Sequence, residues 1–175
     1  EILDFTPPPD GRPGARPRLP DRESMTMTQL QCGMDFGTSN STVAVAGGNA
    51  PPRLLALEGD SVTLPSVIFF SFEDDSVHFG RAAVSEYVTG ADGRLMRSLK
   101  SVLGTSLFAD TTRIKRRAVS FAEILGTFIA EMRARAGAAL DREIDTVVLG
   151  RPVRFVDDDD AADAEAQGQL ESAAR

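Results

Sequence analysis

The sequence predicts an α/β fold built on a mixed sheet with flanking helices, and two observations support this. From residue 29 onward, short segments of alternating apolar and polar residues, bounded by turn-forming residues, predict a series of strands. Farther along, residues 121–139 carry an apolar stripe of helical period, and an apolar segment at 145–150 follows them. A helix that leads into a strand in this way is typical of a sheet covered by helices.

The first 28 residues are expected to be a disordered extension outside the fold. This segment holds six of the ten prolines, namely Pro7, Pro8, Pro9, Pro13, Pro17 and Pro20. It has almost no apolar pattern, so burial cannot offset the entropy that ordering would cost. The chain begins at Glu1, and Met25 and Met27 are both candidate start residues directly before the first strand. Because the chain also ends within a predicted helix, we expect a truncated chain whose folded part is residues 29–175.

Strands dominate the beginning of this folded part. Apolar side chains at positions 30, 32, 34 and 36 alternate with polar or small ones, which predicts the first strand. Further strands are expected at residues 42–46, 53–57, 67–72 and 76–79, with turns at 47–49 and 58–60. A short helix is expected at residues 81–88.

The helix at residues 121–139 has the strongest pattern. Its apolar residues recur at helical spacing and form one stripe: Phe121, Ile124, Leu125, Phe128, Ile129 and Met132. We expect this stripe to face the core. The acidic run at 157–160 follows the strand at 145–150 and precedes an Ala- and Glu-rich segment. We interpret this run as charges that stabilise the N-terminus of a last helix rather than as a metal site.

Composition excludes several classes of function. The chain has 175 residues and a net charge of −7, which argues against a nucleic-acid or anionic-membrane surface. No apolar run approaches the ~20 residues of a membrane span, and no signal peptide is recognisable, so a cytoplasmic location is expected. Cys32 is the single cysteine and cannot form an internal disulfide or a cysteine-based metal site. The single histidine, His78, is expected to be an ordinary strand or turn residue.

The segment that joins the first two predicted strands, DFGTSNS at residues 35–41, is unusually rich in small polar residues. Gly37 permits a tight turn and a close approach of the backbone to a ligand, and the successive amides after it suit an anion. Asp35 would repel phosphate unless a cation lay between them, so the pattern indicates Mg²⁺ bound to a nucleotide. A polar hairpin with an Asx-type turn explains the same spacing, and the two interpretations remain open. The pattern is not a P-loop, which requires Gly-x-x-x-x-Gly-Lys-Ser/Thr.

A resemblance favours the first interpretation. GMDFGTSNSTVAV at residues 33–45 resembles the first phosphate motif of the actin-like ATPase superfamily. Four later segments resemble the 70-kilodalton heat-shock chaperone family in order and spacing: TLPSVIFF at 63–70, HFGRAAVSEY at 78–87, RSLKSVLG at 97–104 and IDTVVLGRPVRF at 144–155. The resemblance covers about residues 31–175. Gly150-Arg151-Pro152 departs from the usual pattern and points to a divergent bacterial branch.

The resemblance implies a fold and a site. The chain would be the first lobe of a ribonuclease-H-like, actin-like ATPase domain, and it would bind ATP or ADP with Mg²⁺. Asp35 would hold Mg²⁺ through water, and the β- and γ-phosphates would be cradled by four residues: Gly37, Thr38, Ser39 and Asn40. Lys100 matches the catalytic lysine that orients the attacking water and stabilises charge on the γ-phosphate.

The same resemblance implies what this stretch of chain lacks. The second phosphate loop, the adenosine pocket and the peptide-binding domain are not recognisable, so we expect negligible ATP hydrolysis by this chain alone. Unfolded client peptides and co-chaperones would bind regions outside it. Two alternatives stay open: the first lobe of a sugar or small-molecule kinase, with Asp74 or Asp75 as a base, and a non-enzymatic truncated product with a vestigial turn.

Overall fold

The computed structural model describes residues 2–4, 30–47, 50–150 and 159–174. Its main sheet has six strands in the order β1-β11-β2-β3-β4, with β5 paired to β3. The strands are β1 (Ile2–Asp4), β2 (Gln31–Asp35), β3 (Asn40–Gly47), β4 (Ala50–Leu54), β5 (Leu64–Pro65) and β11 (Thr146–Gly150). Strand β11 runs parallel to β2, and every other pairing in this sheet is antiparallel. The predicted mixed sheet is therefore confirmed.

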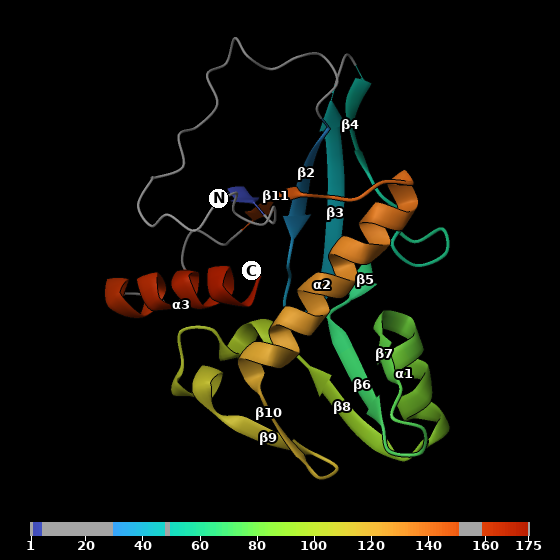
Figure 1. Cartoon of the computed structure of the whole chain (residues 1–175), viewed down its shortest axis with the longest axis vertical. Coiled ribbons are helices and arrows are strands. Elements are labelled where there is room, and N and C mark those ends of the chain that lie inside the picture. The colour runs from blue at the N-terminus through green and yellow to red at the C-terminus, as the bar shows by residue number, and fades with distance from the viewer. Residues whose placement is uncertain (1, 5–29, 48–49, 151–158, 175) are drawn as a thin grey trace, which may run out of the picture.

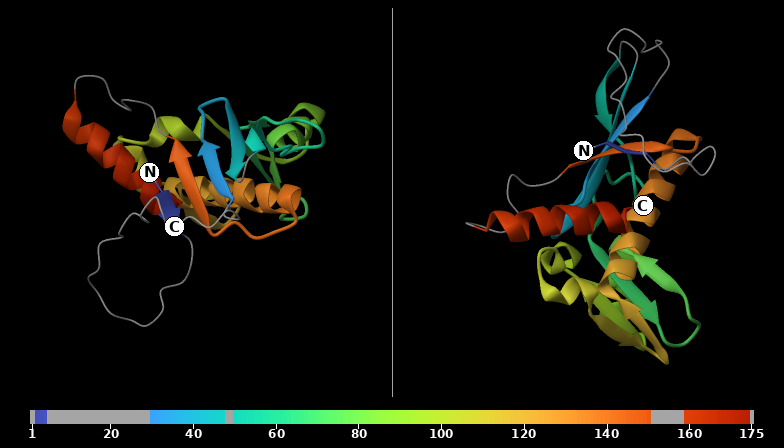
Figure 2. Two further views of the ribbon diagram at one scale, coloured as in Figure 1. Left: turned by 90° about the horizontal axis from the view of Figure 1, so that it is seen from above. Right: turned by 60° about the vertical axis from the view of Figure 1, so that its left-hand side comes forward.

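Helix α2 (Phe121–Leu140) covers one face of this sheet, and Figures 1 and 2 show it running across the strands. Its buried residues are Ile124, Leu125, Phe128, Ile129, Met132 and Ala136. All but Ala136 belong to the predicted apolar stripe. They pack against the inward-facing residues of the sheet, such as Met34 and Val43. A capping box begins the helix: the Ser120 hydroxyl accepts from the Glu123 amide, and the Glu123 carboxylate accepts from the Ser120 amide.

A smaller antiparallel sheet lies beyond the N-terminal part of α2 (Figure 1). Its order is β7-β6-β8, and helix α1 packs against it. A separate two-stranded hairpin and two 3₁₀ helices follow along the chain. The bounds are β6 (Val67–Ser71), β7 (Val77–Phe79), α1 (Gly80–Thr89), β8 (Gly93–Arg97), η1 (Leu99–Val102), η2 (Ser106–Ala109), β9 (Thr111–Ile114) and β10 (Arg117–Ser120).

Helix α3 (Asp160–Ala173) lies against α2, and a glycine makes this approach possible. A Cβ at position 126 of α2 would lie 2.8 Å from the carbonyl oxygen of Ala173. The Asp159 carboxylate begins α3 by accepting hydrogen bonds from the amides of Ala161 and Ala162 at 3.1 and 2.9 Å. For Asp159 and Asp160, the predicted stabilisation of a helix N-terminus is therefore seen. Asp157 and Asp158, like Arg151 and Pro152, lie outside the described residues.

The structure differs from the sequence-based expectations in three places. Strand β4 lies at 50–54 rather than 53–57, because Leu55 and Leu57 leave the sheet edge and enter the core, with exposed fractions of 0% and 4%. Its two prolines are tolerated because β4 is an edge strand. Residues 2–4, within the segment predicted to be disordered, pair with β11; residues 5–28 of that segment lie outside the described residues. Strand β8 and the β9–β10 hairpin were not expected.

Among the residues described, no helix is long and apolar enough to cross a membrane.

Candidate functional site

The turn between β2 and β3 is tighter than a side chain at its glycine would allow. Strand β2 ends at Asp35 and β3 begins at Asn40. A Cβ on Gly37 would overlap the carbonyl oxygen of Asn40 and would lie 3.3 Å from its carbonyl carbon. Glycine is therefore required by the close approach of two backbone segments.

Two buried hydroxyls hold this turn from the inside. The Gly37 amide donates to Ser41 Oγ at 3.3 Å, and Ser66 Oγ donates to the Gly37 carbonyl at 2.7 Å. The two hydroxyl oxygens are 2.9 Å apart. Because the Ser66 hydroxyl proton is donated to the Gly37 carbonyl, the Ser41 hydroxyl must donate to Ser66 Oγ. The three hydrogen bonds therefore form a closed ring through Gly37, Ser41 and Ser66. Both serines are 0% exposed.

Ser66 also fixes the far side of the turn, because its amide donates to the Ser39 carbonyl at 2.9 Å. The carbonyl oxygens of Gly37 and Ser39 are thus both engaged by Ser66. This draws the negative ends of two peptide dipoles into the protein, away from the exposed face of the turn. We did not predict Ser41 or Ser66 from the sequence. A signal existed for Ser41, since it occupies an inward position of β3, in the same alternation as Val43 and Val45.

The opposite face of the turn is open to solvent. Asp35, Thr38, Ser39 and Asn40 are exposed and Gly37 is half-buried. Asp35 ends β2 beside Gly150, the last residue of the parallel strand β11. A Cβ on Gly150 would lie 4.0 Å from Asp35 Oδ1, so the glycine leaves the space beside this carboxylate open. The acid and the polar residues of the turn therefore share one accessible surface.

Lys100 reaches the same turn from the second half of the chain. It lies in η1, and its Nζ donates to the Phe36 carbonyl at 2.8 Å. Its neighbours Leu99 and Val102 are buried and anchor the short helix. Partial burial lowers the pKa of Lys100, and the negative charge of Asp35 partly opposes that shift. The structure thus brings the predicted acid, turn and lysine together, although 64 residues separate Phe36 from Lys100 in the sequence.

The acids nominated for a kinase base lie elsewhere, in the loop between β6 and β7. Asp74 accepts hydrogen bonds from the hydroxyl and the amide of Ser76 at 2.7 and 3.0 Å, which hold the pKa of its carboxyl well below the usual range. Asp75 pairs with Lys115 Nζ at 2.6 Å. Both acids are therefore engaged in contacts of their own, away from the turn at residues 35–40.

The single cysteine and the single histidine take ordinary positions. Cys32 is 4% exposed on the inward face of β2, and burial raises the pKa of its thiol. His78 lies on β7, with Nε2 2.8 Å from Ser76 Oγ. Within the described residues, no group of three or more His, Cys, Asp or Glu side chains is placed to hold a metal ion. This finding does not bear on the role proposed for Asp35, which would reach Mg²⁺ through water.

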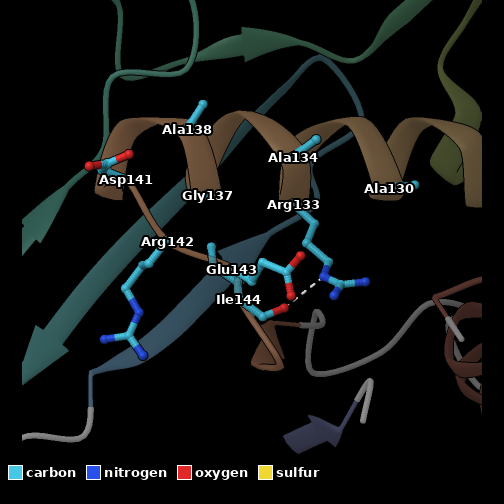
Figure 3. A pocket seen from close by; sticks show the side chains of 9 residues that line it. All are labelled: Ala130, Arg133, Ala134, Gly137, Ala138, Asp141, Arg142, Glu143 and Ile144. Carbon is cyan, nitrogen blue, oxygen red and sulfur yellow. Dashed lines mark hydrogen bonds between the residues drawn. The ribbon is translucent and has the colours of Figure 1, made fainter. Parts of the chain in front are cut away.

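A hollow of about 530 Å³ lies at the C-terminal end of α2, and no residue of the turn lines it. Small residues such as Ala134 and Ala138 form one wall, and the loop that leads to Ile144 forms the other. Figure 3 shows the Arg133 guanidinium directed toward the Ile144 carbonyl, to which its Nε donates at 2.7 Å. The arginine thus fastens the loop to the helix. A stripe of small residues beside such a structural contact does not define a ligand site.

Comparisons with known proteins agree with one another. A family model described as Hsp70 protein matches residues 31–122, which is just over half of the 175-residue chain. The chain is also 30% identical over 125 residues to the chaperone protein DnaK of Mycoplasma mycoides subsp. mycoides SC, and the aligned part is 71% of this chain and 20% of that protein. The chain therefore spans about one fifth of the length of this curated relative. The turn, Ser66 and Lys100 all lie within the segment that the family model matches.

Proposed function

Because this chain belongs to the Hsp70 protein family, we propose that it is the nucleotide-binding lobe of a chaperone ATPase and grips Mg-ATP or Mg-ADP through residues 35–40. The observation that carries the proposal is the construction of the turn. Its carbonyls at Gly37 and Ser39 are drawn inward by Ser66, while Thr38, Ser39 and Asn40 are exposed on the outer face. A turn whose carbonyls are engaged inside the protein and whose small polar residues are exposed suits a polyphosphate.

Each site residue has a separate role in this proposal. Gly37, Thr38, Ser39 and Asn40 would cradle the β- and γ-phosphates, with the Thr38 hydroxyl available to the γ-phosphate. Asp35 is exposed in the same segment and would hold Mg²⁺ through the water bound to the cation. The cation, when bound, neutralises phosphate charge that the Asp35 carboxylate would otherwise repel.

Lys100 supplies fixed positive charge in the proposal. Its Nζ is held at the Phe36 carbonyl, at the entrance of the turn. Phosphoryl transfer is accelerated mainly by positioned positive charge, so a partly buried lysine at this point suits stabilisation of the γ-phosphate and orientation of an attacking water. A hydrogen bond to a backbone carbonyl keeps the ammonium in place before the substrate arrives.

Calorimetric titration of Mg-ADP into the 175-residue polypeptide tests the proposal. We expect saturable binding by the wild type and a loss of affinity of about 10- to 100-fold in Asp35→Ala. Asp92→Ala is a matched control, because it removes an exposed acid outside the turn. Absence of binding to the wild type would favour the non-enzymatic alternative, and equal binding by the two alanine variants would remove Asp35 from the site.

The activity of a whole chaperone is a further part of the proposal. The parent protein would use ATP hydrolysis to switch its affinity for unfolded client peptides, with co-chaperones as partners, in the cytoplasm. The 175-residue polypeptide alone is expected to hydrolyse ATP negligibly. A single phosphate turn leaves the other side of the nucleotide exposed to solvent, and water weakens every electrostatic contact. Steady-state phosphate release well above the buffer blank would contradict this expectation.

A further inference from the structure

A groove of about 660 Å³ lies between the β6–β7 hairpin, the β9–β10 hairpin and the N-terminal part of α2. We call it the hairpin groove. Its apolar lining comes from all three elements and consists of Phe70, Val77, Ile114, Val119 and Ile124. None of the residues of the proposed nucleotide site lines it, so the hairpin groove is a separate surface.

The rim of this groove carries a concentration of positive charge that is unusual for the chain. Residues 111–120 include four cations and no acid, while the whole chain has a net charge of −7. These cations are Arg113, Lys115, Arg116 and Arg117, all of them exposed, and the last three line the groove whereas Arg113 does not. Two have acidic partners: Lys115 pairs with Asp75 and Arg117 with Glu123. Among the described residues, Arg116 is the cation of the groove lining that forms no ion pair.

The Lys115–Asp75 pair joins the tips of the two hairpins across the groove, at 2.6 Å. Both residues have left-handed backbones, with φ of 52° at Lys115 and 62° at Asp75. Residues with a Cβ adopt this conformation at a cost. An ion pair in which the Asp75 side chain is 81% exposed contributes little to stability. Another carboxylate can therefore replace Asp75 as the partner of Lys115 at little cost in stability.

We propose that the hairpin groove binds an extended segment of a partner protein in which acidic residues alternate with apolar ones. The apolar side chains pack on the floor, beside Val77 and Ile114. The carboxylates pair with Arg116 and with Lys115, where a peptide acid replaces Asp75. A nucleic acid fits less well, because the apolar floor can hold alternate side chains of a peptide but offers no partner to a continuous phosphate backbone. This inference does not depend on nucleotide binding.

The test is fluorescence anisotropy with the full chain and a short fluorescein-labelled peptide in which Asp and Glu alternate with Leu and Val. A second peptide replaces every acid with Lys. The key variant combines Lys115→Gly with Arg116→Ser; glycine suits the left-handed backbone at position 115, so the hairpin is retained. Arg94→Ser is the matched control, since Arg94 is an exposed cation on β8 that does not line the groove.

We expect saturable binding of the acidic peptide, no binding of the lysine peptide, and affinity about tenfold weaker in the double variant. Arg94→Ser should bind as the wild type does, and Val77→Ser should weaken binding, because Val77 is 39% exposed and its truncation alters the floor rather than the core. The proposal is overturned if the acidic peptide does not bind, if the double variant binds it equally well, or if a single-stranded oligonucleotide binds more tightly than the peptide.

Discussion

Replacement of Phe128 by leucine should destabilise the fold more than its modest change in volume suggests. The Phe128 side chain on α2 is 0% exposed. Its ring centroid lies 5.8 Å from that of Phe36, in the β2–β3 turn, and 6.5 Å from that of Phe79, at the end of β7. One ring of the main helix therefore contacts both the segment of the proposed site and the smaller sheet.

The magnitude follows from these two contacts. Each aromatic pair contributes about 0.5–1.5 kcal/mol beyond the burial of area. Leucine keeps most of the apolar burial and loses both pairs, so Phe128→Leu should lower the free energy of unfolding by about 1–3 kcal/mol. Truncation to alanine would also open a cavity and cost about 3–5 kcal/mol.

Urea-induced unfolding, followed by circular dichroism, measures this difference. Tyr87→Leu is the control, because Tyr87 is 59% exposed and its replacement should change stability by less than about 0.5 kcal/mol. A double-mutant cycle with Phe36→Leu should give a coupling energy of about 0.5–1.5 kcal/mol. If Phe128→Leu cost no more than Tyr87→Leu, or if the cycle showed no coupling, the aromatic contacts would not join these elements.

Three further predictions concern the turn and the start of α2. Ser66→Ala leaves the Gly37 carbonyl and the Ser41 hydroxyl without their buried partner and should cost about 1–3 kcal/mol of stability in urea unfolding; an unchanged midpoint would show that the ring of hydrogen bonds is unimportant. Burial lowers the pKa of Lys100 in the folded state, so its charged form destabilises the fold. This destabilisation is fully present below the lowered pKa and is relieved as pH rises from there toward the ordinary pKa of lysine. Wild-type stability should therefore gain over Lys100→Met across that interval, and parallel pH profiles would contradict this. The pKa of Glu123 is also lowered, chiefly by its hydrogen bonds from Ser120, so its contribution is present above the ordinary glutamate pKa and is lost as pH falls through the lowered one; Glu123→Gln should flatten acid unfolding there, and an identical acid profile would exclude the effect.

The elements that were predictable from sequence have patterns that packing reinforces. Helix α2 combined an apolar stripe with a Ser120–Glu123 cap, and β2 and β3 alternated around a turn that required glycine. Strand β8 escaped detection because two of its five residues are arginines. The β9–β10 hairpin lacks the usual Gly or Asn at its tip, where Lys115 takes the left-handed backbone instead.

The residues of the candidate site also differ in whether the sequence alone could identify them. Asp35 and Gly37 were identified from local chemistry, because a single short segment contains the acid, the glycine and the polar residues. Lys100 was nominated only through a family resemblance, since a lone lysine carries no sign of which distant backbone carbonyl it will contact. Ser66 was missed because its role depends on the pairing of β5 with β3, a long-range contact that no local pattern specifies.

At the contact between α2 and α3, glycine is favoured over alanine, which is the reverse of their usual helix propensities. Alanine normally stabilises a helix interior by about 1 kcal/mol relative to glycine. At position 126 the added methyl group would press on the Ala173 carbonyl, so the better helix former would push α3 away. An engineering effort that ranked substitutions by helix propensity alone would choose the wrong residue at this position, and would loosen the docking of the chain's last helix while strengthening the helix it packs on.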